Sequence, residues 1–237
     1  MGAAPLSPVP GTIEVWWCDL RNRSEDDLAE WESAVSSEER IRSGRFRFAA
    51  DRRRFLAGRG LLRTLLGGYL GCSPERLRFA RDGKGKPRLT GTDMRFNMSR
   101  TSDGVLIGFS RSSEIGVDVE RVRDGYAGED VAGKFFAPAE VASLAELPES
   151  RRSEGFFRVW TAKEAYLKAR GDGLGYPLDA FAVPVGGREP GRLRWHRDDA
   201  EARRWWIVPL TPSAGFVAAV AVEGRAPEIV IREARVS

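Results

Sequence analysis

The sequence predicts an α+β fold made of two similar halves, each a small, mainly antiparallel sheet packed with helices. The order strand, helices, strands occurs twice, in about 110 residues each, without a repeat at the level of single residues. Of the 237 residues 42% are hydrophobic, including 7 Trp and 12 Phe, enough for a sizeable core. We divide the chain into residues 1–112 and 113–237 and expect the functional site in the cleft between the halves, because clefts often bind ligands.

The first half begins with a strand at residues 12–20, where apolar and mixed residues alternate with the period of two that is typical of a strand. A helix is expected from Asp51, its predicted N-cap, to Leu70, with an apolar stripe and with most of its arginines off that stripe. A plausible hairpin turn lies at 101–104. Short strands are expected at 77–81, 95–98 and 105–109.

The second half begins with a strand at residues 115–122. A helical stretch is expected after Pro138 and a longer helix from about Glu154 to Ala169, which a glycine-rich segment then ends. The remaining strands are expected at 192–197, 203–210, 215–223 and 228–233.

Counts of cysteine and histidine restrict the chemistry. Cys18 and Cys72 are the only cysteines, so we expect neither a disulfide framework nor a zinc knuckle, and a reducing cytoplasm is the expected location. His196 is the only histidine and lies in an expected strand, so a triad hydrolase or a zinc site of paired imidazoles would depend on this one ring. Acid, base and metal chemistry is therefore expected from carboxylates and lysines.

The chain shows no segment that suggests a membrane. No run of 18 apolar residues occurs, and the first ten residues lack the cationic start and apolar run of a signal peptide. The net charge of +4 favours an acidic partner or a phosphorylated ligand but is too small to imply nucleic acid.

Two carboxylates stand on one face of the strand that begins the second half. In the segment Ile115-Gly116-Val117-Asp118-Val119-Glu120, alternation sends Asp118 and Glu120 to the same side. On the following long helix, steps of four align Trp160, Glu164 and Lys168 along one face. A solvated strand face and an ordinary Glu–Lys helix pair would explain these residues without function. Three carboxylates with a neighbouring lysine would also form a suitable binding site for magnesium and phosphate.

These segments resemble two signature motifs of the 4′-phosphopantetheinyl transferases, in particular the single-chain type that activates surfactin synthetase. The matching segments are GVDVE at 116–120 and FRVWTAKEAYLKARGDGL at 157–174, preceded by GKP at 85–87 and FNMSR at 96–100. The resemblance covers residues 83–177 well, and the flanks match mainly in length and element order. It implies transfer of the phosphopantetheine arm of coenzyme A to a serine of an apo acyl or peptidyl carrier protein, with magnesium, and release of 3′,5′-ADP.

The resemblance also implies roles for individual residues. Asp118, Glu120 and Glu164 look like the magnesium ligands, and Glu164, or a water that it orients, like the general base for the incoming serine. Lys168 resembles the lysine beside the pyrophosphate, where it would stabilise the departing phosphate. The residues that look like the coenzyme-binding set are Arg42, Arg54, Lys86, Pro87, Ser99, Arg100 and Lys168.

One position departs from the family pattern. Where the family has Ser-His, this chain has Ser99-Arg100. Arginine still donates to a phosphate and keeps its charge, whereas any role of a titrating imidazole is lost. The departure therefore concerns catalytic efficiency and leaves the expected fold unchanged.

Two other readings compete with an active transferase: a relative that binds coenzyme A but no longer transfers, and a basic nucleic-acid-binding module on the arginine-rich helix at 52–63. The three retained carboxylates argue against the first, and the absence of a known aromatic and basic motif argues against the second. We therefore expect a monomeric cytoplasmic enzyme of polyketide or nonribosomal peptide biosynthesis, with coenzyme A between its halves and without nucleic-acid or membrane partners.

Overall fold

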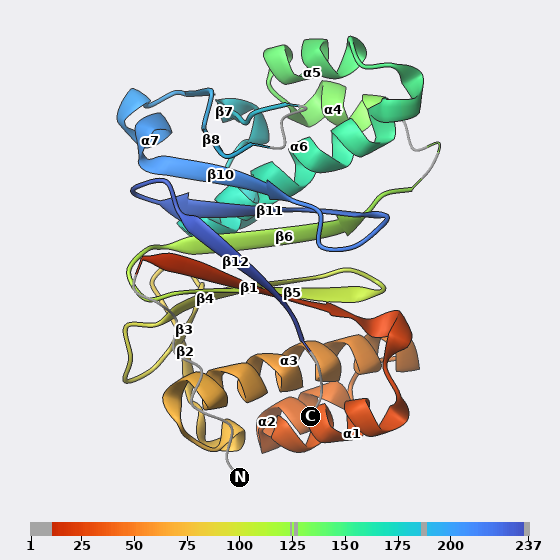
Figure 1. Ribbon diagram of the computed structural model, residues 1–237, viewed down its shortest axis with the longest axis vertical. Coiled ribbons are helices and arrows are strands. Elements are labelled where there is room, and N and C mark those ends of the chain that lie inside the picture. The colour runs from red at the N-terminus through yellow and green to blue at the C-terminus, as the bar shows by residue number, and fades with distance from the viewer. Residues whose placement is uncertain (1–10, 124, 126–127, 186–188, 235–237) are drawn as a thin grey trace.

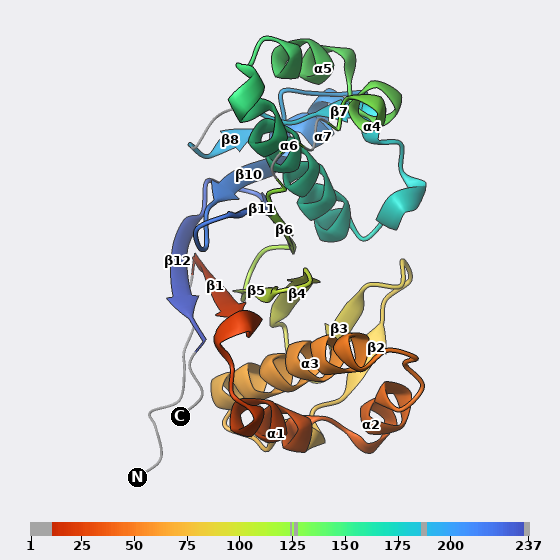
Figure 2. The same cartoon turned by 90° about the vertical axis from the view of Figure 1, so that its right-hand side faces the viewer.

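Two four-stranded sheets face each other, and the long helices lie on their outer sides, so the molecule has helix, sheet, sheet and helix layers (Figures 1 and 2). The structure is a computed structural model that describes residues 11–123, 125, 128–185 and 189–234. One sheet has the strand order β12-β1-β5-β4 and the other the order β6-β11-β10-β8. The prediction of an α+β fold with small, mainly antiparallel sheets and packed helices is confirmed.

The first half contains the sheet that α3 covers, together with a two-stranded ribbon formed by β2 and β3. Its elements are β1 (Thr12–Asp19), α1 (Glu25–Ala34), α2 (Ser37–Ser43), α3 (Ala49–Leu70), β2 (Phe79–Arg81), β3 (Pro87–Leu89), β4 (Arg95–Arg100) and β5 (Gly104–Ser110).

The second half contains the other large sheet, covered by α6, and a small ribbon of β7 and β9. Its elements are β6 (Ile115–Arg121), α4 (Glu129–Phe135), α5 (Pro138–Ala145), α6 (Glu149–Arg170), β7 (Phe181–Ala182), β8 (Gly191–Arg192), β9 (Trp195–His196), α7 (Asp199–Arg204), β10 (Trp205–Leu210), β11 (Phe216–Glu223) and β12 (Glu228–Glu233). The duplication extends to the covering helices, because α3 and α6 both have 22 residues and both end at a left-handed glycine, Gly71 or Gly171.

The two sheets are joined by an apolar core. Residues of both sheets, among them Val15 and Leu106 from one and Val117 and Val220 from the other, are fully buried in this shared cluster. At its edge the Val117 N–H donates to the Asn97 Oδ1 atom at 2.9 Å and so ties β6 to β4. These two edge strands carry the segments FNMSR and GVDVE, which is how the fold brings the two segments together.

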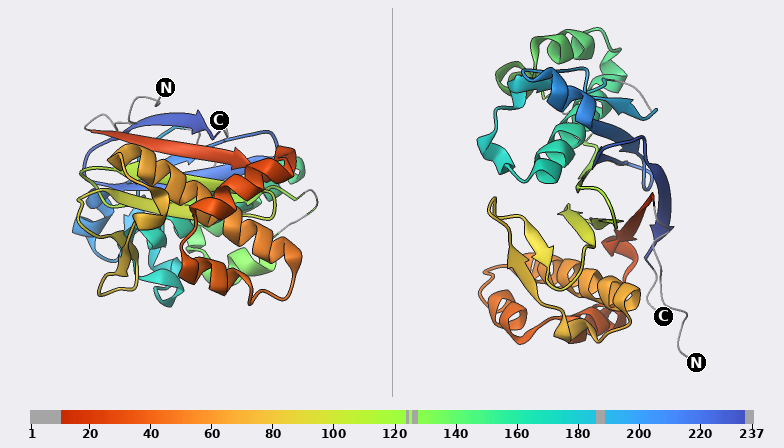
Figure 3. Two further views of the ribbon diagram at one scale, coloured as in Figure 1. Left: turned by 90° about the horizontal axis from the view of Figure 1, so that it is seen from below. Right: turned by 90° about the vertical axis from the view of Figure 1, so that its left-hand side faces the viewer.

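The last strand crosses from the second half to the first. β12 pairs in parallel with β1, from Thr12 opposite Glu228 to Trp17 opposite Glu233, and Figure 3 shows the two strands side by side. Arg232 of β12 also donates to the buried Glu14 of β1 at 2.9 Å. The division at residues 112 and 113 therefore does not describe this strand, which completes the sheet of the first half.

Several expected boundaries were wrong. The helix of the first half begins at Ala49 with Phe48 as its N-cap, so Asp51 lies inside the first turn and does not cap it. The long helix of the second half begins at Glu149, five residues before the predicted start. Residues 199–204 form α7 where a strand was expected to begin at 203. Helices α1 and α2 were missed, although each begins with a capping box, Ser24 with Asp27 and Ser36 with Glu39.

The single histidine lies in a short strand, as predicted, but it is buried. The His196 ring is within hydrogen-bonding distance of the Tyr176 hydroxyl at 2.8 Å, away from the carboxylates. Among the described residues, no helix has an apolar stretch long enough to cross a bilayer.

Candidate active site

A pocket between β4, β6 and α6 collects the polar residues of the signature segments. Its lining residues are Met98, Ser99, Arg100, Asp118, Glu120, Trp160, Glu164 and Lys168. The predicted alternation along β6 is confirmed, because Val117 and Val119 enter the core between the sheets while Asp118 and Glu120 line the pocket. The predicted stripe on α6 is confirmed as well, since Trp160, Glu164 and Lys168 share this pocket.

Asp118 is the most tightly held carboxylate of the pocket. Its Oδ1 atom accepts hydrogen bonds from Ser99 Oγ at 2.7 Å and from Lys168 Nζ at 2.6 Å, and Lys168 also donates to Ser99 Oγ at 3.1 Å. Asp118 and Ser99 are both buried. Ser99 therefore orients the carboxylate, whereas the side chain of Lys168, 30% exposed, can reach the solvent-facing part of the pocket.

The carboxylates retain unused acceptor capacity. Among the described residues, the Asp118 Oδ2 and Glu164 Oε1 atoms are buried without a hydrogen-bond partner, a costly arrangement unless a cation or a donor satisfies them. Burial and the neighbouring charge of Asp118 raise the pKa of Glu164 and raise that of Glu120 to about 7. The pocket thus concentrates negative charge that a divalent cation would relieve.

The three carboxylates do not converge as a ready ligand set. Within the described part of the chain, no three acidic, histidine or cysteine side chains are grouped closely enough to hold a metal ion. The ammonium group of Lys168 instead occupies one oxygen of Asp118. The donor chemistry fits magnesium, which takes carboxylate oxygens, but binding requires the side chains to turn toward the ion.

The raised pKa of Glu120 predicts a pH effect on stability. Because the folded-state pKa of about 7 lies above the ordinary value of 4.5, the folded protein binds more protons between these values, and Glu120 destabilises it progressively as the pH rises through this window. In metal-free buffer, the unfolding free energy of the wild type relative to Glu120→Gln should fall from pH 4.5 to pH 7. Urea unfolding of the two proteins measures this difference in unfolding free energy. A difference that does not change with pH would contradict the raised pKa of Glu120.

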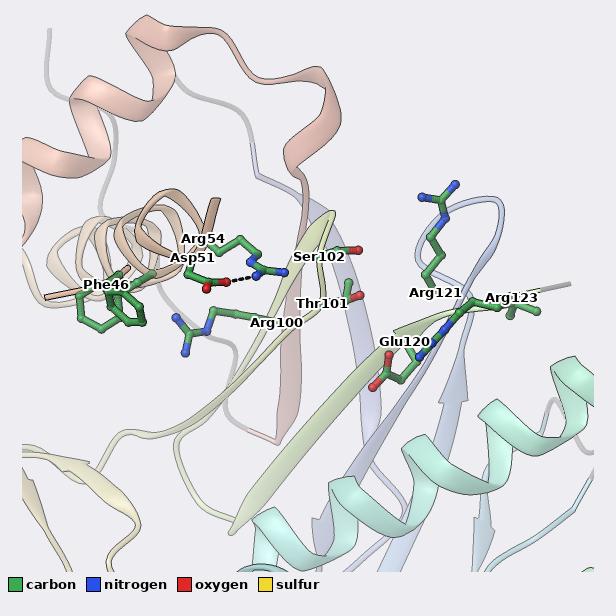
Figure 4. Close-up of a pocket in the computed structure, with 11 residues that line it drawn as sticks. Phe46, Asp51, Arg54, Arg100, Thr101, Ser102, Glu120, Arg121 and Arg123 are labelled. Carbon is green, nitrogen blue, oxygen red and sulfur yellow. Dashed lines mark hydrogen bonds and ion pairs between the residues drawn. The ribbon is translucent and has the colours of Figure 1, made fainter. Parts of the chain in front are cut away.

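Arginines form the opposite wall of the cleft. Arg42 on α2 and Arg100 on β4 lie by the Phe55 ring, with their guanidinium carbons 5.4 and 5.9 Å from its centroid, and Arg54 on α3 lines a pocket together with Phe55 and Arg100. Figure 4 shows Arg54 paired with Asp51 and near Arg100 in a neighbouring pocket of about 870 Å³, which shares Arg100 and Glu120 with the carboxylate pocket. Among the described residues, neither the Arg42 nor the Arg100 side chain has a hydrogen bond or an ion pair, so both guanidinium groups are free to bind an anion.

Gly58 of α3 leaves room for the side chain of Arg100. A Cβ atom at Gly58 of α3 would lie 2.7 Å from the Cδ atom of Arg100, so only glycine lets the arginine stem cross the helix in this position. Partial desolvation and the nearby Arg59, Arg42 and Arg54 lower the pKa of Arg100. The guanidinium remains charged, because its ordinary pKa is far above neutrality.

Two of the lysines in the motifs have structural roles. Lys86 is buried, and its ammonium group donates to Glu114, to the Ile115 carbonyl and to the Ala169 carbonyl at 2.8–2.9 Å. All three of its donors are used, so the ammonium group has none left for the nucleotide, and the contact of the Lys86–Pro87 loop with the nucleotide stays a prediction. Pro87 lines an arginine-rich pocket of the first half. Lys163 of α6 forms a fully buried ion pair with Glu140 of α5 at 2.7 Å.

The carboxylates of this pocket and the unpaired arginines beside it have the chemistry that suits a phosphorylated ligand together with a hard cation. Comparison with family models finds the 4′-phosphopantetheinyl transferase superfamily at residues 114–221 and the N-terminal region of 4′-phosphopantetheinyl transferases at 22–111.

The curated proteins to which this chain is similar are also 4′-phosphopantetheinyl transferases. The chain is 38% identical over 223 residues to the 4′-phosphopantetheinyl transferase HetI of Nostoc sp., covering 92% of this chain and 91% of that protein. It is 32% identical over 181 residues to a 4′-phosphopantetheinyl transferase of Bacillus subtilis, covering 71% of this chain and 80% of the relative. The transferase Sfp of Bacillus subtilis is 29% identical over 164 residues, which cover 69% and 72% of the two chains.

The chain therefore belongs to the 4′-phosphopantetheinyl transferase superfamily. It is an enzyme of the kind that transfers the phosphopantetheine arm of coenzyme A to carrier proteins.

Proposed function

We propose that this enzyme transfers the phosphopantetheine arm of coenzyme A to a serine of an apo acyl or peptidyl carrier protein, with magnesium, and releases 3′,5′-ADP. One observation carries the proposal: buried, unpartnered oxygens of Asp118 and Glu164 lie in one pocket with the unpaired guanidinium group of Arg100, and that of Arg42 lines the adjoining pocket. The first pair suits a hard cation, and the second suits the phosphates of a coenzyme.

Asp118, Glu120 and Glu164 would hold the magnesium ion. When bound, the ion would offset the negative charge that develops on the pyrophosphate during transfer. The crowded carboxylates of the pocket favour this occupant, since burial and the charge of Asp118 raise the pKa of Glu120 and Glu164, and a cation would stabilise their ionised forms.

The protein side chains would handle the proton and the leaving group. The serine hydroxyl oxygen of the carrier attacks the phosphorus that bears the pantetheine arm, the bridging bond to the other phosphate breaks, and the electron pair leaves with 3′,5′-ADP. Glu164, or a water that it orients, would accept the serine proton. Lys168, whose ammonium group pairs with Asp118 in this structure, would turn that group toward the departing phosphate.

Release of 3′,5′-ADP tests the transfer directly. Chromatography of a reaction with coenzyme A, magnesium and apo carrier protein should show 3′,5′-ADP formed in proportion to enzyme. Tight binding of coenzyme A without this product would instead favour the relative that no longer transfers. Binding of oligonucleotides with a steep dependence on salt would favour the nucleic-acid-binding alternative.

Replacement of Arg100 should weaken coenzyme binding. Loss of a charge-assisted hydrogen bond costs about 1.5–3 kcal/mol, so Arg100→Ala should raise the KM for coenzyme A about ten- to a hundredfold. Arg100→His should recover much of the affinity at low pH, where imidazole is charged, and less above neutrality. Steady-state kinetics across pH measure both effects.

Gly58→Ala provides a matched variant for this test. It leaves every charge in place but pushes the stem of Arg100 aside, so it should raise the same KM in the same direction. An unchanged KM in Arg100→Ala would remove this residue from the coenzyme site and leave the departure from the family pattern unexplained.

The finer assignments are part of the same proposal. We place the enzyme with the single-chain type that activates surfactin synthetase, acting in polyketide or nonribosomal peptide biosynthesis. A monomer would suffice, because both walls of the cleft come from one chain, and light scattering that shows an obligate dimer would count against it. The free thiols of Cys18 and Cys72 support work in the reducing cytoplasm.

A further inference from the structure

The ribbon of β2 and β3 reaches from the first half toward the end of α6 in the second half (Figure 2). Its loop carries Lys84 and Lys86. A Cβ atom at Gly171, the residue that ends α6, would lie 3.5 Å from the side chain of Lys84 and 3.6 Å from that of Lys86. The loop therefore packs directly against the end of the helix that carries Glu164 and Lys168.

Lys86 joins three separate segments through one ammonium group. Its Nζ atom donates to the Ala169 carbonyl of α6 at 2.8 Å, and to the Ile115 carbonyl of β6 and the Glu114 Oε2 atom at 2.9 Å. The side chain is only 4% exposed. Because a buried carbonyl without a donor is costly, these contacts hold the start of β6 and the end of α6 together.

The contacts of this ammonium group lie next to residues of the carboxylate pocket. Ala169 directly follows Lys168 on α6, and Ile115 precedes Asp118 by three residues on β6. At Gly116 an added Cβ would lie 2.4 Å from the Ala169 nitrogen, so β6 and α6 meet at the same point. A shift of either element here would therefore move the side chains that line the pocket.

The first half also supplies the donors that the end of α6 lacks. The last four carbonyls of a helix have no partner within the helix. Lys86 donates to the carbonyl of Ala169. Lys84 donates to the Arg170 carbonyl at 3.2 Å and forms an ion pair with Asp172 at 2.7 Å. Two positive charges at this end also interact favourably with the helix dipole.

The loop keeps its shape independently of these contacts. The Asp82 Oδ1 atom accepts from the backbone N–H groups of Lys84 and Lys86, both at 3.0 Å, and the Gly85 N–H donates to the Asp82 carbonyl at 2.9 Å. The turn places Gly85 at a φ of 83°, which favours glycine. Removal of the Lys86 ammonium group should therefore leave the loop folded and break only its connection to β6 and α6.

We propose that Lys86 is a positioning residue of the transfer reaction and that Lys84 supports it from the same loop. By joining the ribbon to β6 and α6, Lys86 fixes Glu164 and Lys168 relative to Asp118 and to the first half. The inference rests on the proposed function, which assigns the reacting groups. All three donors of Lys86 are used away from the carboxylate pocket, so it acts through the elements that it joins.

Steady-state kinetics of Lys86→Met separate positioning from binding. Methionine keeps most of the aliphatic chain and removes the ammonium group. With saturating apo carrier protein, kcat should fall about ten- to a hundredfold, because a small displacement of reacting groups lowers the rate by this much. The KM for coenzyme A should change little, because the loop itself stays folded. A contact of the ammonium group with the nucleotide would give the opposite split, a raised KM with an unchanged kcat.

Hydrogen exchange of the whole chain tests the same contacts without transfer. In Lys86→Met the backbone amides of residues 167–171 should exchange about ten- to a hundredfold faster, because the end of α6 loses a charged donor. The amides of α3 should remain as protected as in the wild type. A role in overall stability alone would accelerate exchange in α3 as well and leave kcat unchanged at temperatures where the variant is folded.

Lys84→Met keeps the test decisive if Lys86→Met does not fold. The Lys84 side chain is 55% exposed, so the variant should fold, and it should change kcat and local exchange in the same direction by a smaller factor. Arg76→Gln, which removes an exposed positive charge from the same half, is the matched control and should retain both wild-type values.

Three results would overturn the inference: a folded Lys86→Met variant with the wild-type kcat, one with a raised KM alone, or one with unchanged exchange at the end of α6. Unchanged kcat and exchange in Lys84→Met would do so if Lys86→Met does not fold. A wild type that forms no 3′,5′-ADP from coenzyme A, with faster local exchange in Lys86→Met, would contradict the proposed transfer alone and support the contact of Lys86 with the helix end.

Discussion

Asp118→Asn and Glu164→Gln should each reduce transfer at least about a hundredfold, since each removes a hard oxygen ligand from a site expected to act through magnesium. Both residues have a buried oxygen with no protein partner, and both line the pocket that faces Arg100. The substitutions keep side-chain shape, so folding should survive. The initial rate of carrier modification at saturating coenzyme A is the measurement.

A control carboxylate and a second readout make this test specific. Asp130→Asn on α4 alters an exposed acid outside the pocket and should keep the wild-type rate. Calorimetric titration with magnesium alone should show binding to the wild type that Asp118→Asn weakens. A folded Asp118→Asn or Glu164→Gln variant that works near the wild-type rate would disprove the metal assignment.

Gly116→Ala should lower the unfolding free energy by at least about 3 kcal/mol, because overpacking against backbone cannot be relieved by a rotamer change. A Cβ atom at this position would lie 2.0 Å from the Ala165 carbonyl oxygen and 2.4 Å from the Ala169 nitrogen, both in the backbone of α6. Strand β6 and helix α6 can approach this closely only at glycine, and their approach sets the separation of Asp118 from Glu164. Activity should therefore fall together with stability.

Gly133→Ala is the matched control for this prediction. It lies in α4, and an added Cβ would meet nothing within 4 Å. Because alanine is the better helix former, this variant should be more stable by about 0.5–1 kcal/mol. Denaturant unfolding measures both variants, and a Gly116→Ala midpoint equal to that of the wild type would show that β6 and α6 are not held as described.

Local periodicity predicted the acidic half of the site. The period of two along β6 was enough to put Asp118 and Glu120 on one face, and steps of four on α6 aligned Glu164 with Lys168. Each pattern depends only on the geometry of its own element, so the pattern could be read without tertiary information. The two-half architecture followed in the same way from the repeated order of elements.

The remaining features of the fold and the site depend on contacts between residues far apart in the sequence, which local patterns do not predict. Lys86 and Lys163 appear in sequence as ordinary motif lysines, and only the fold shows that their ammonium groups are buried on carbonyl oxygens or Glu140. The crossing of β12 to β1 joins residues more than 200 positions apart, for which no local pattern exists. The ion pairs of Glu39 with Arg59 and Arg63 of α3 also join two helices, and the sequence shows only the capping box of α2 that contains Glu39.

Mass spectrometry of an apo carrier protein tests the central claim most directly. With coenzyme A, magnesium and this enzyme, the carrier should gain the mass of one phosphopantetheine group on a serine, and removal of magnesium by a chelator should prevent the gain. The account predicts both results. A folded enzyme that leaves a range of apo acyl and peptidyl carrier proteins unmodified, or that modifies them equally well without a divalent cation, would contradict it.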